Sequence, residues 1–284
     1  MDNTDVLQRL LSKKESCTII EGNSLIKQKI LDNDLFCAGK LGTSEFTVVQ
    51  YIRRGLQISP FIRKLVALAG IFPDTESTFT DFYNIYTTSC RSVDIMGSWI
   101  QGDYDFLKSV NPSVDLVTLR SLEPYYFENP WSQALSGKKV TVVNNFSESI
   151  QAQYKLKELV WPDKSVLPDF DLQIVNTPYH AIRPSKYDNW IDVLSDIYEK
   201  TIATKPDFII VGAGAYSIPL IAGLKECGIP GIHLGGATQI LFGIKGQRWD
   251  EHEVISKFYN DSWIRPSQEE VPEDYKQVEN GCYW

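Results

Sequence analysis

The feature that most constrains the fold is a short strand signal followed by a tight turn and a helix signal. This pattern occurs three times, with its strand and helix parts at 139–143 and 148–160, 208–211 and 217–226, and 231–234 and 237–243. Strand, turn and helix in repetition are typical of a parallel sheet with crossover helices. The pattern predicts an α/β fold with a doubly wound, mostly parallel Rossmann-like sheet.

Three weaker strand signals, at 35–38, 116–119 and 172–175, bring the expected sheet to about six strands. Between the first two of them, apolar residues recur at three- and four-residue spacing, so we expect a helical insertion or cap at about 56–112. The last part of the chain, at about 265–284, is rich in Glu, Pro and Gln and predicts an extended tail. No internal repeat divides the chain, and we expect a single α/β domain over 1–284.

Composition excludes several classes of function. Twenty-eight basic residues against thirty-six acidic ones give a net charge of −8, which disfavours nucleic-acid binding because phosphate contacts need a clustered basic face. The long uncharged run 208–224 is interrupted by glycine and proline, and we expect no transmembrane segment. Five scattered cysteines without a C-x-x-C pair, and no apolar leader, favour a reducing cytoplasmic location. Oligomeric state, including a homo-oligomer, is left open.

In open α/β sheets, ligands bind at the carboxyl ends of the strands, so the turns that follow the expected strands are the candidate sites. The first turn, 39–45, precedes a helix, and its residues read either as a helix cap with an acidic first turn or as a ligand-binding loop. In the second reading the binding residues are Lys40, Gly42, Thr43 and Ser44, and Glu45 acts on a metal ion or a hydroxyl.

The second turn, 212–217, begins like a dinucleotide-binding G-x-G turn, but Ser217 replaces the third glycine. No acidic residue ends the next strand, so the nicotinamide interpretation fails. A phosphate at the helix N-terminus remains compatible with the turn. The candidate residues are Gly212, Gly214, Ala215, Tyr216 and Ser217.

The third turn starts at His233, which is either a structural histidine or a catalytic one. Two glycines and a polar pair follow it, and two cations with an aromatic residue come shortly after. The candidate residues here are His233, Gly235, Gly236, Gln239, Lys245 and Arg248. A fourth turn, 144–149, is either a simple helix cap or part of the site. Because the first three turns follow strands of one parallel sheet, we expect them to converge on one pocket.

The chain lacks a G-x-S-x-G elbow, a Walker A loop and an H-E-x-x-H motif, which disfavours serine hydrolases, P-loop enzymes and zincins. Four segments taken together, 39–45, 206–216, 232–239 and Arg248-Trp249, resemble the GT-D-fold glycosyltransferase-like proteins of polysaccharide biosynthesis loci. The resemblance covers roughly 35–55 and 139–250.

The resemblance implies a transferase that moves a sugar from a nucleotide-sugar, with UDP as the expected nucleotide, to a glycan or lipid-linked glycan. In the family's D-x-E motif, the first Asp aligns with Thr43 and the Glu with Glu45. Only Glu45 therefore carries over as a metal ligand, for Mn²⁺ or Mg²⁺. The I-D-I-G-H-like turn of the family is replaced here by Ile232-His-Leu-Gly-Gly.

In this interpretation Glu45 and His233 are the candidate catalytic bases. Lys40, Lys245, Arg248 and the helix N-termini neutralise the diphosphate leaving group. Two alternatives stay open. One is a Rossmann-like nucleotide-dependent enzyme of another class, an oxidoreductase or a methyltransferase, and the other is a non-catalytic module that binds sugar nucleotides.

Overall fold

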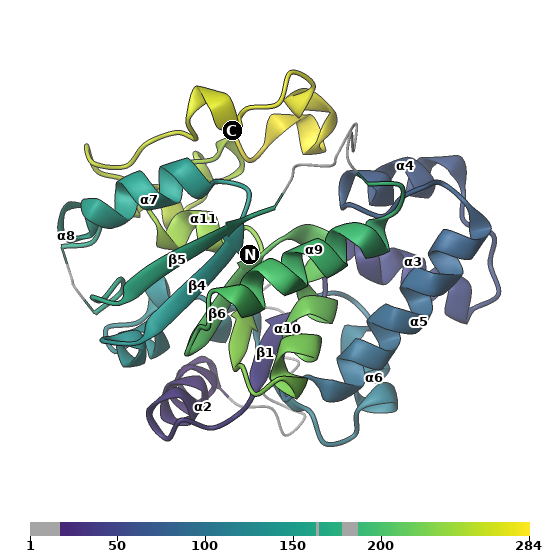
Figure 1. Cartoon of the computed structure of the whole chain (residues 1–284), viewed down its shortest axis with the longest axis horizontal. Helices are drawn as coiled ribbons and strands as arrows, with labels where there is room; N and C mark the ends of the chain where they lie inside the picture. Colours follow the sequence, from purple (N-terminus) through teal and green to yellow (C-terminus); the bar gives the residue numbers. More distant parts are fainter. Residues whose placement is uncertain (1–17, 163–164, 178–186) are drawn as a thin grey trace.

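The computed structural model describes residues 18–162, 165–177 and 187–284. Seven strands form one sheet in the order β3-β2-β1-β7-β6-β4-β5, and all neighbouring strands run parallel (Figure 1). Helices cover both faces, so the predicted doubly wound α/β fold is confirmed. The strands are β1 (Cys37–Lys40), β2 (Ile95–Ser98), β3 (Asp115–Thr118), β4 (Lys139–Asn144), β5 (Asp171–Asn176), β6 (Phe208–Gly212) and β7 (Gly231–His233).

The central strands are apolar at nearly every position because both faces of the sheet are buried. In β6, Phe208 and Ile210 pack into one core, and Ile209 and Val211 pack into the other. The second of these cores is covered by α3 (Thr43–Arg53), α4 (Pro60–Leu68), α5 (Glu76–Ser92), α6 (Asp103–Val110), α9 (Trp190–Ala203) and α10 (Ser217–Glu226). The first is covered by α2 (Ile19–Leu31), α7 (Ser147–Lys155), α8 (Lys157–Val160) and α11 (Ala237–Leu241).

Two segments differ from the sequence predictions. The stretch 56–112 holds helices α4, α5 and α6, but it also contains β2, which pairs with β1 on one side and β3 on the other. The tail 265–284 is folded into short 3₁₀ turns, including η7 (Gln268–Glu270) and η9 (Glu279–Gly281), rather than extended. Trp284 fixes its end by donating a hydrogen bond from Nε1 to the carbonyl oxygen of Glu270, at 2.9 Å.

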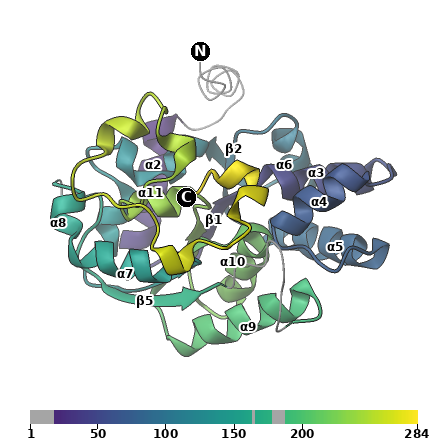
Figure 2. The same cartoon turned by 90° about the horizontal axis from the view of Figure 1, so that it is seen from above.

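The strand order reverses between β1 and β7, which lie side by side although they are far apart in the sequence. Such a reversal opens a crevice at the carboxyl ends of the strands. Figure 2 looks down on this edge and shows the C-terminal tail lying between α7 and the α3–α4 pair. Within the described ranges, no helix has the length and apolar character needed to cross a membrane.

Candidate functional site

A pocket of about 590 Å³ lies at the carboxyl edge of the sheet, where β1, β7, β6 and β4 end. The first three turns singled out from the sequence all contribute to its wall. The predicted residues that line it are Lys40, Gly42, Thr43, Ser44, Glu45, Gly212, Gly214, Tyr216, His233, Gly235, Gly236, Gln239 and Arg248. The structure therefore brings together thirteen of the residues proposed from sequence.

Three proposed residues, Ala215, Ser217 and Lys245, lie outside the pocket wall. Ser217 is buried, and its Oγ accepts a hydrogen bond from the backbone N–H of Ala213 at 3.0 Å. The Lys245 ammonium lies 5.4 Å from the ring centroid of Tyr259. These side chains stabilise the turn and the neighbouring loop, and the prediction that they contact a ligand is not supported by their positions.

Most backbone N–H groups of the turn 212–217 already donate hydrogen bonds to other groups of the protein. The N–H of Ala215 donates to the carbonyl oxygen of Ala69 at 3.0 Å, and that of Tyr216 donates to Ala213 at 3.2 Å. Gly214 has φ +53°, and a Cβ there would lie 2.7 Å from the same Ala69 oxygen. This turn therefore shapes the pocket by packing against the end of α4 and offers a phosphate few free donors.

The turn after β7 has the opposite character. Gly235 has φ +61°, and within the described part of the chain the N–H groups of Gly236 and Ala237 donate no hydrogen bond. A Cβ at Gly235 would lie 3.2 Å from Nζ of Lys40, so the ammonium sits directly beside this turn. Two backbone donors and one cation at the same point make this the part of the pocket that best suits an anion.

Lys40 ends β1 with its side chain in the pocket wall. Its ammonium lies 5.2 Å from the ring centroid of Trp99, whose Nε1 donates to the carbonyl oxygen of Leu41 at 2.9 Å. Burial lowers the pKa of the Lys40 ammonium, and the carboxylates of Glu45 and Glu123 oppose this effect. A buried ammonium with a lowered pKa gains most from a ligand that brings negative charge.

Glu45 lies in the first turn of α3 and is buried, with 7% of its surface exposed. Its carboxylate folds back over Gly42 and takes up the space that a Cβ at position 42 would need. Burial raises the pKa of the Glu45 carboxyl, while its own backbone N–H and Lys40 act in the other direction. The carboxylate thus lies in the first turn of α3, where the helix dipole favours negative charge, and the same side chain lines the pocket, so both interpretations of this turn stay open.

His233 ends β7 and is buried against the pocket. Its Nδ1 lies 3.1 Å from the carbonyl oxygen of Val211, and since a carbonyl can only accept, Nδ1 is the protonated nitrogen. Burial, with Lys40 nearby, lowers the pKa of His233 to about 3. The ring is therefore neutral at physiological pH with its lone pair on Nε2, which makes it a hydrogen-bond acceptor but a weak base.

Glu123 is a pocket carboxyl that the sequence analysis missed. Burial raises its pKa to about 7, although Lys40 and Arg120 favour its ionised form and the Tyr125 hydroxyl donates a hydrogen bond to it. It follows the 3₁₀ turn η1 (Leu119–Leu122), directly after β3. The signal that could have found it is its position after an expected parallel strand, at the same sheet edge as the other turns.

The C-terminal tail closes one side of the pocket with Val278, Glu279 and Tyr283. Arg248 lies between this tail and the turn after β7, with its guanidinium 5.1 Å from the ring centroid of Tyr283 and 3.7 Å from the Glu279 carboxylate. Gln239 holds the tail in place, donating from Nε2 to the carbonyl oxygen of Tyr283 at 2.6 Å. The tail was not expected to reach the site.

The fourth turn, 144–149, is held by protein groups. The Glu270 carboxylate, from the tail, accepts hydrogen bonds from the N–H groups of Glu148 and Ser149 at 2.7 and 3.1 Å. It also accepts one from the Ser149 hydroxyl. Asn144 donates from Nδ2 to the carbonyl oxygen of Gly212 at 2.9 Å. A carboxylate of the chain itself thus occupies the N-terminus of α7, and Asn144, Asn145 and Phe146 also line the pocket, so the turn is both a helix cap and part of the pocket wall.

Among residues 18–162, 165–177 and 187–284, no group of three or more His, Cys, Asp and Glu side chains is placed to hold a metal ion. Glu45, the metal ligand implied by the resemblance, brings a single carboxyl to the turn after β1, and the cation Lys40 lies near it. The described donor set does not fit a metal ion held by the protein alone.

Comparisons of the chain with protein-family models, with curated proteins and with solved structures found no match.

Proposed function

We propose that this protein is a glycosyltransferase that moves a sugar from a nucleotide-sugar, with a UDP-sugar as the first candidate, to a hydroxyl of a glycan acceptor. The observation that carries the proposal is the pairing of two features in one pocket. One is the anion-binding turn at Gly236 and Ala237 with Lys40 beside it, and the other is Glu123, a carboxyl with a pKa near neutrality.

The pocket suits a donor of this kind in size and lining. At about 590 Å³ it lies within the range of roughly 300–1,000 Å³ that is usual for small-molecule sites. The diphosphate would rest on the turn after β7, with Lys40 and Arg248 supplying charge. Trp99, Tyr126 and Tyr283 line the same space and offer aromatic faces for a base or a sugar ring.

The chemistry follows from the ionisation of the pocket groups. Glu123, as carboxylate, takes the proton from the acceptor hydroxyl while the hydroxyl oxygen forms a bond to the anomeric carbon. The bond between that carbon and the diphosphate oxygen breaks, and the electron pair leaves with the nucleoside diphosphate. Lys40 and Arg248 stabilise the charge that develops on it. Neutral His233 accepts a hydrogen bond and orients a substrate hydroxyl.

This assignment changes the roles expected from the sequence. Glu45 and His233 were the predicted bases. The Glu45 carboxylate folds back over Gly42 in the first turn of α3, and the pKa of His233 is lowered to about 3, so we assign the base to Glu123 instead. Any Mn²⁺ or Mg²⁺ would be held mainly by the diphosphate of the donor, with at most one protein carboxylate. Lys40 and Arg248 would supply part of the positive charge that a metal ion otherwise provides to the diphosphate.

A cytoplasmic location belongs to the same proposal. Four described cysteines, Cys37, Cys90, Cys227 and Cys282, are free thiols, which fits a reducing compartment. The dinucleotide-dependent alternative lacks support in the fold, since β7, the strand after the glycine-rich turn, ends in His233 rather than in an acidic residue.

A thermal-shift panel tests the proposal. UDP-, GDP-, TDP- and CMP-sugars, each with and without Mn²⁺, are compared with NAD and S-adenosylmethionine. We expect one class of nucleotide-sugar to raise the unfolding midpoint by mass action. Lys40→Met removes the cation and should abolish the shift, whereas Lys155→Met, at an exposed position on α7, should leave it unchanged. A shift with NAD or S-adenosylmethionine alone would contradict the proposal.

A further inference from the structure

The segment between Glu45 and Asp74 has a charge opposite to that of the whole chain. It contains four basic residues and no acidic ones, in a chain with a net charge of −8. The segment spans α3, the following loop and α4. Such local segregation marks a surface that meets a negatively charged partner.

The same segment exposes two large apolar side chains. Phe61, in the first turn of α4, is 75% exposed, and Leu56, in the loop before it, is 50% exposed. Arg54 and Lys64 are exposed beside them in the sequence. We call these four residues, Arg54, Leu56, Phe61 and Lys64, the α4 knob.

Helix α4 carries the knob on a face that continues into the pocket. Phe61, Leu65 and Leu68 are spaced four and three residues apart and share one face, while Ile62 and Val66 pack into the core on another. Leu65 and Leu68 line the pocket wall. An apolar stripe thus leads from the exposed knob to the rim of the pocket.

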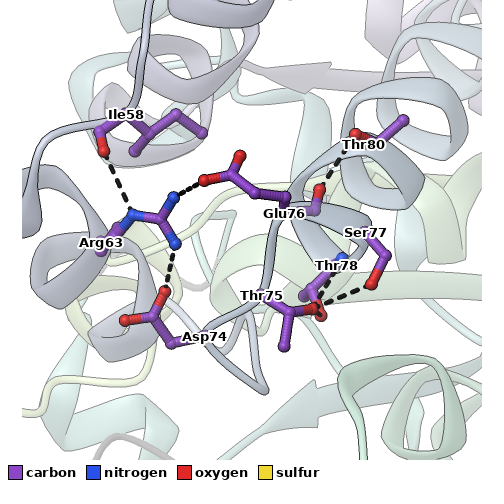
Figure 3. A network of polar contacts seen from close by, with 8 residues as sticks. All are labelled: Ile58, Arg63, Asp74, Thr75, Glu76, Ser77, Thr78 and Thr80. Carbon is purple, nitrogen blue, oxygen red and sulfur yellow. Dashed lines mark hydrogen bonds and ion pairs between the residues drawn. The ribbon is translucent and has the colours of Figure 1, made fainter.

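Arg63 is another cation of the segment, but it is paired with protein groups and is not part of the α4 knob. Its Nε donates to the carbonyl oxygen of Ile58 at 3.1 Å, and its guanidinium pairs with Asp74 at 2.7 Å and with Glu76 (Figure 3). At 100° per residue, Arg63 points about 200° around α4 from Phe61. The two acidic residues are therefore paired on the far side of the helix.

We propose that the α4 knob docks on the surface of a lipid bilayer that contains anionic lipids. Phe61 and Leu56 enter the interface between headgroups and acyl chains, and Arg54 and Lys64 contact the lipid phosphates. Single protruding side chains on a convex helix suit a fluid surface better than a complementary protein groove. Together with the proposed function, on which this further step rests, docking would bring the pocket rim to a lipid-linked acceptor.

Vesicle co-sedimentation of the full chain tests the docking without any donor or acceptor. We expect binding to vesicles of phosphatidylcholine with phosphatidylglycerol, weaker binding to phosphatidylcholine alone, and loss of the difference at high salt. Phe61→Ser removes one buried apolar side chain from the bilayer and should weaken binding about tenfold. The double variant Arg54→Glu, Lys64→Glu should abolish the preference for anionic vesicles.

Leu159→Ser is the matched control. Leu159 is 59% exposed on α8, which lies at the opposite side of the molecule from α4 in both views (Figures 1 and 2). This variant should bind as the unmodified protein does. Absence of vesicle binding, or equal weakening by Leu159→Ser and Phe61→Ser, would overturn the proposal.

A change of oligomeric state caused by Phe61→Ser in vesicle-free solution would also overturn it, since the knob would then be an interface between copies. Turnover of a soluble donor is measured separately and should be the same in Phe61→Ser as in the unmodified protein. The turnover assay, which contains no vesicles, therefore shows whether the glycosyltransferase proposal fails. Vesicle co-sedimentation, which contains no substrate, shows whether the docking proposal fails.

Discussion

Replacing Glu123 by Gln separates the catalytic use of this carboxyl from its effect on stability. Glu123→Gln keeps the shape of the side chain and removes the proton acceptor. General base catalysis contributes about 10²–10⁴-fold, so we expect turnover of the donor onto an acceptor to fall by at least about a hundredfold. Donor affinity should change little, because Lys40 and the turn after β7 hold the diphosphate.

The same substitution should stabilise the protein at high pH. Burial raises the pKa of the Glu123 carboxyl from 4.5 to about 7, so the folded state favours the protonated form. The stability that this group contributes is fully present below pH 4.5 and is lost as the pH rises through about 7. At about 1.4 kcal/mol for each pH unit, the loss reaches at most about 3 kcal/mol, since water enters the open pocket.

Two measurements on the unmodified protein and Glu123→Gln check this reasoning. In urea unfolding, the free energy of unfolding of the variant should exceed that of the unmodified protein at pH 8, and the difference should be small at pH 5. In the unmodified protein kcat/KM should rise with pH and level off above about 7, where the carboxylate predominates. A variant that is fully active, or less stable at both pH values, would refute the assignment.

Four further variants, together with chelation, test the neighbouring parts of the pocket. Gly235→Ala and Gly228→Ala, with φ of +61° and +82°, should each lower the free energy of unfolding by about 1 kcal/mol. Only Gly235→Ala should weaken nucleotide binding, measured by calorimetry, because the added Cβ contacts Lys40. Glu270→Ala should lower the free energy of unfolding by about 1–3 kcal/mol in urea and leave nucleotide affinity unchanged, because it caps α7 outside the pocket. Chelation should reduce turnover without abolishing it. Glu45→Ala should reduce turnover more than chelation does, because it removes a pocket carboxylate that interacts with Lys40. Complete loss of turnover in chelator, restored by Mn²⁺, would contradict this.

The sheet was predictable where the sequence repeats a strong pattern. β4, β6 and β7 are short strands that a glycine-containing or polar turn and a helix follow, and the sequence located each within a residue or two. β2 was missed because Ile95, Met96, Gly97 and Ser98 show neither alternation nor a β-branched run and follow directly on the long helix α5. Its strand conformation comes from pairing with both β1 and β3, which no local pattern encodes.

The site was predictable to the extent that it follows from parallel topology. The turns after β1, β6 and β7 share one sheet edge, and the structure brings them to one pocket as expected. Glu123 was missed because the pKa of its carboxyl is set by burial and by the opposing effect of Lys40, and both depend on the folded chain. The tail was missed for the same reason, since tertiary contacts with Gln239, Arg248 and Trp249 hold Tyr283 at the pocket.

The central claim is that the pocket transfers a sugar from a nucleotide-sugar, and release of nucleotide from the donor tests it most directly. The unmodified protein is incubated with each nucleotide-sugar that shifts its unfolding midpoint, and free nucleotide and released or transferred sugar are quantified over time. The account predicts that at least one donor is cleaved at its anomeric carbon, and that Lys40→Met and Glu123→Gln both suppress the reaction. Binding without any cleavage would contradict it and identify the pocket as a non-catalytic site for sugar nucleotides.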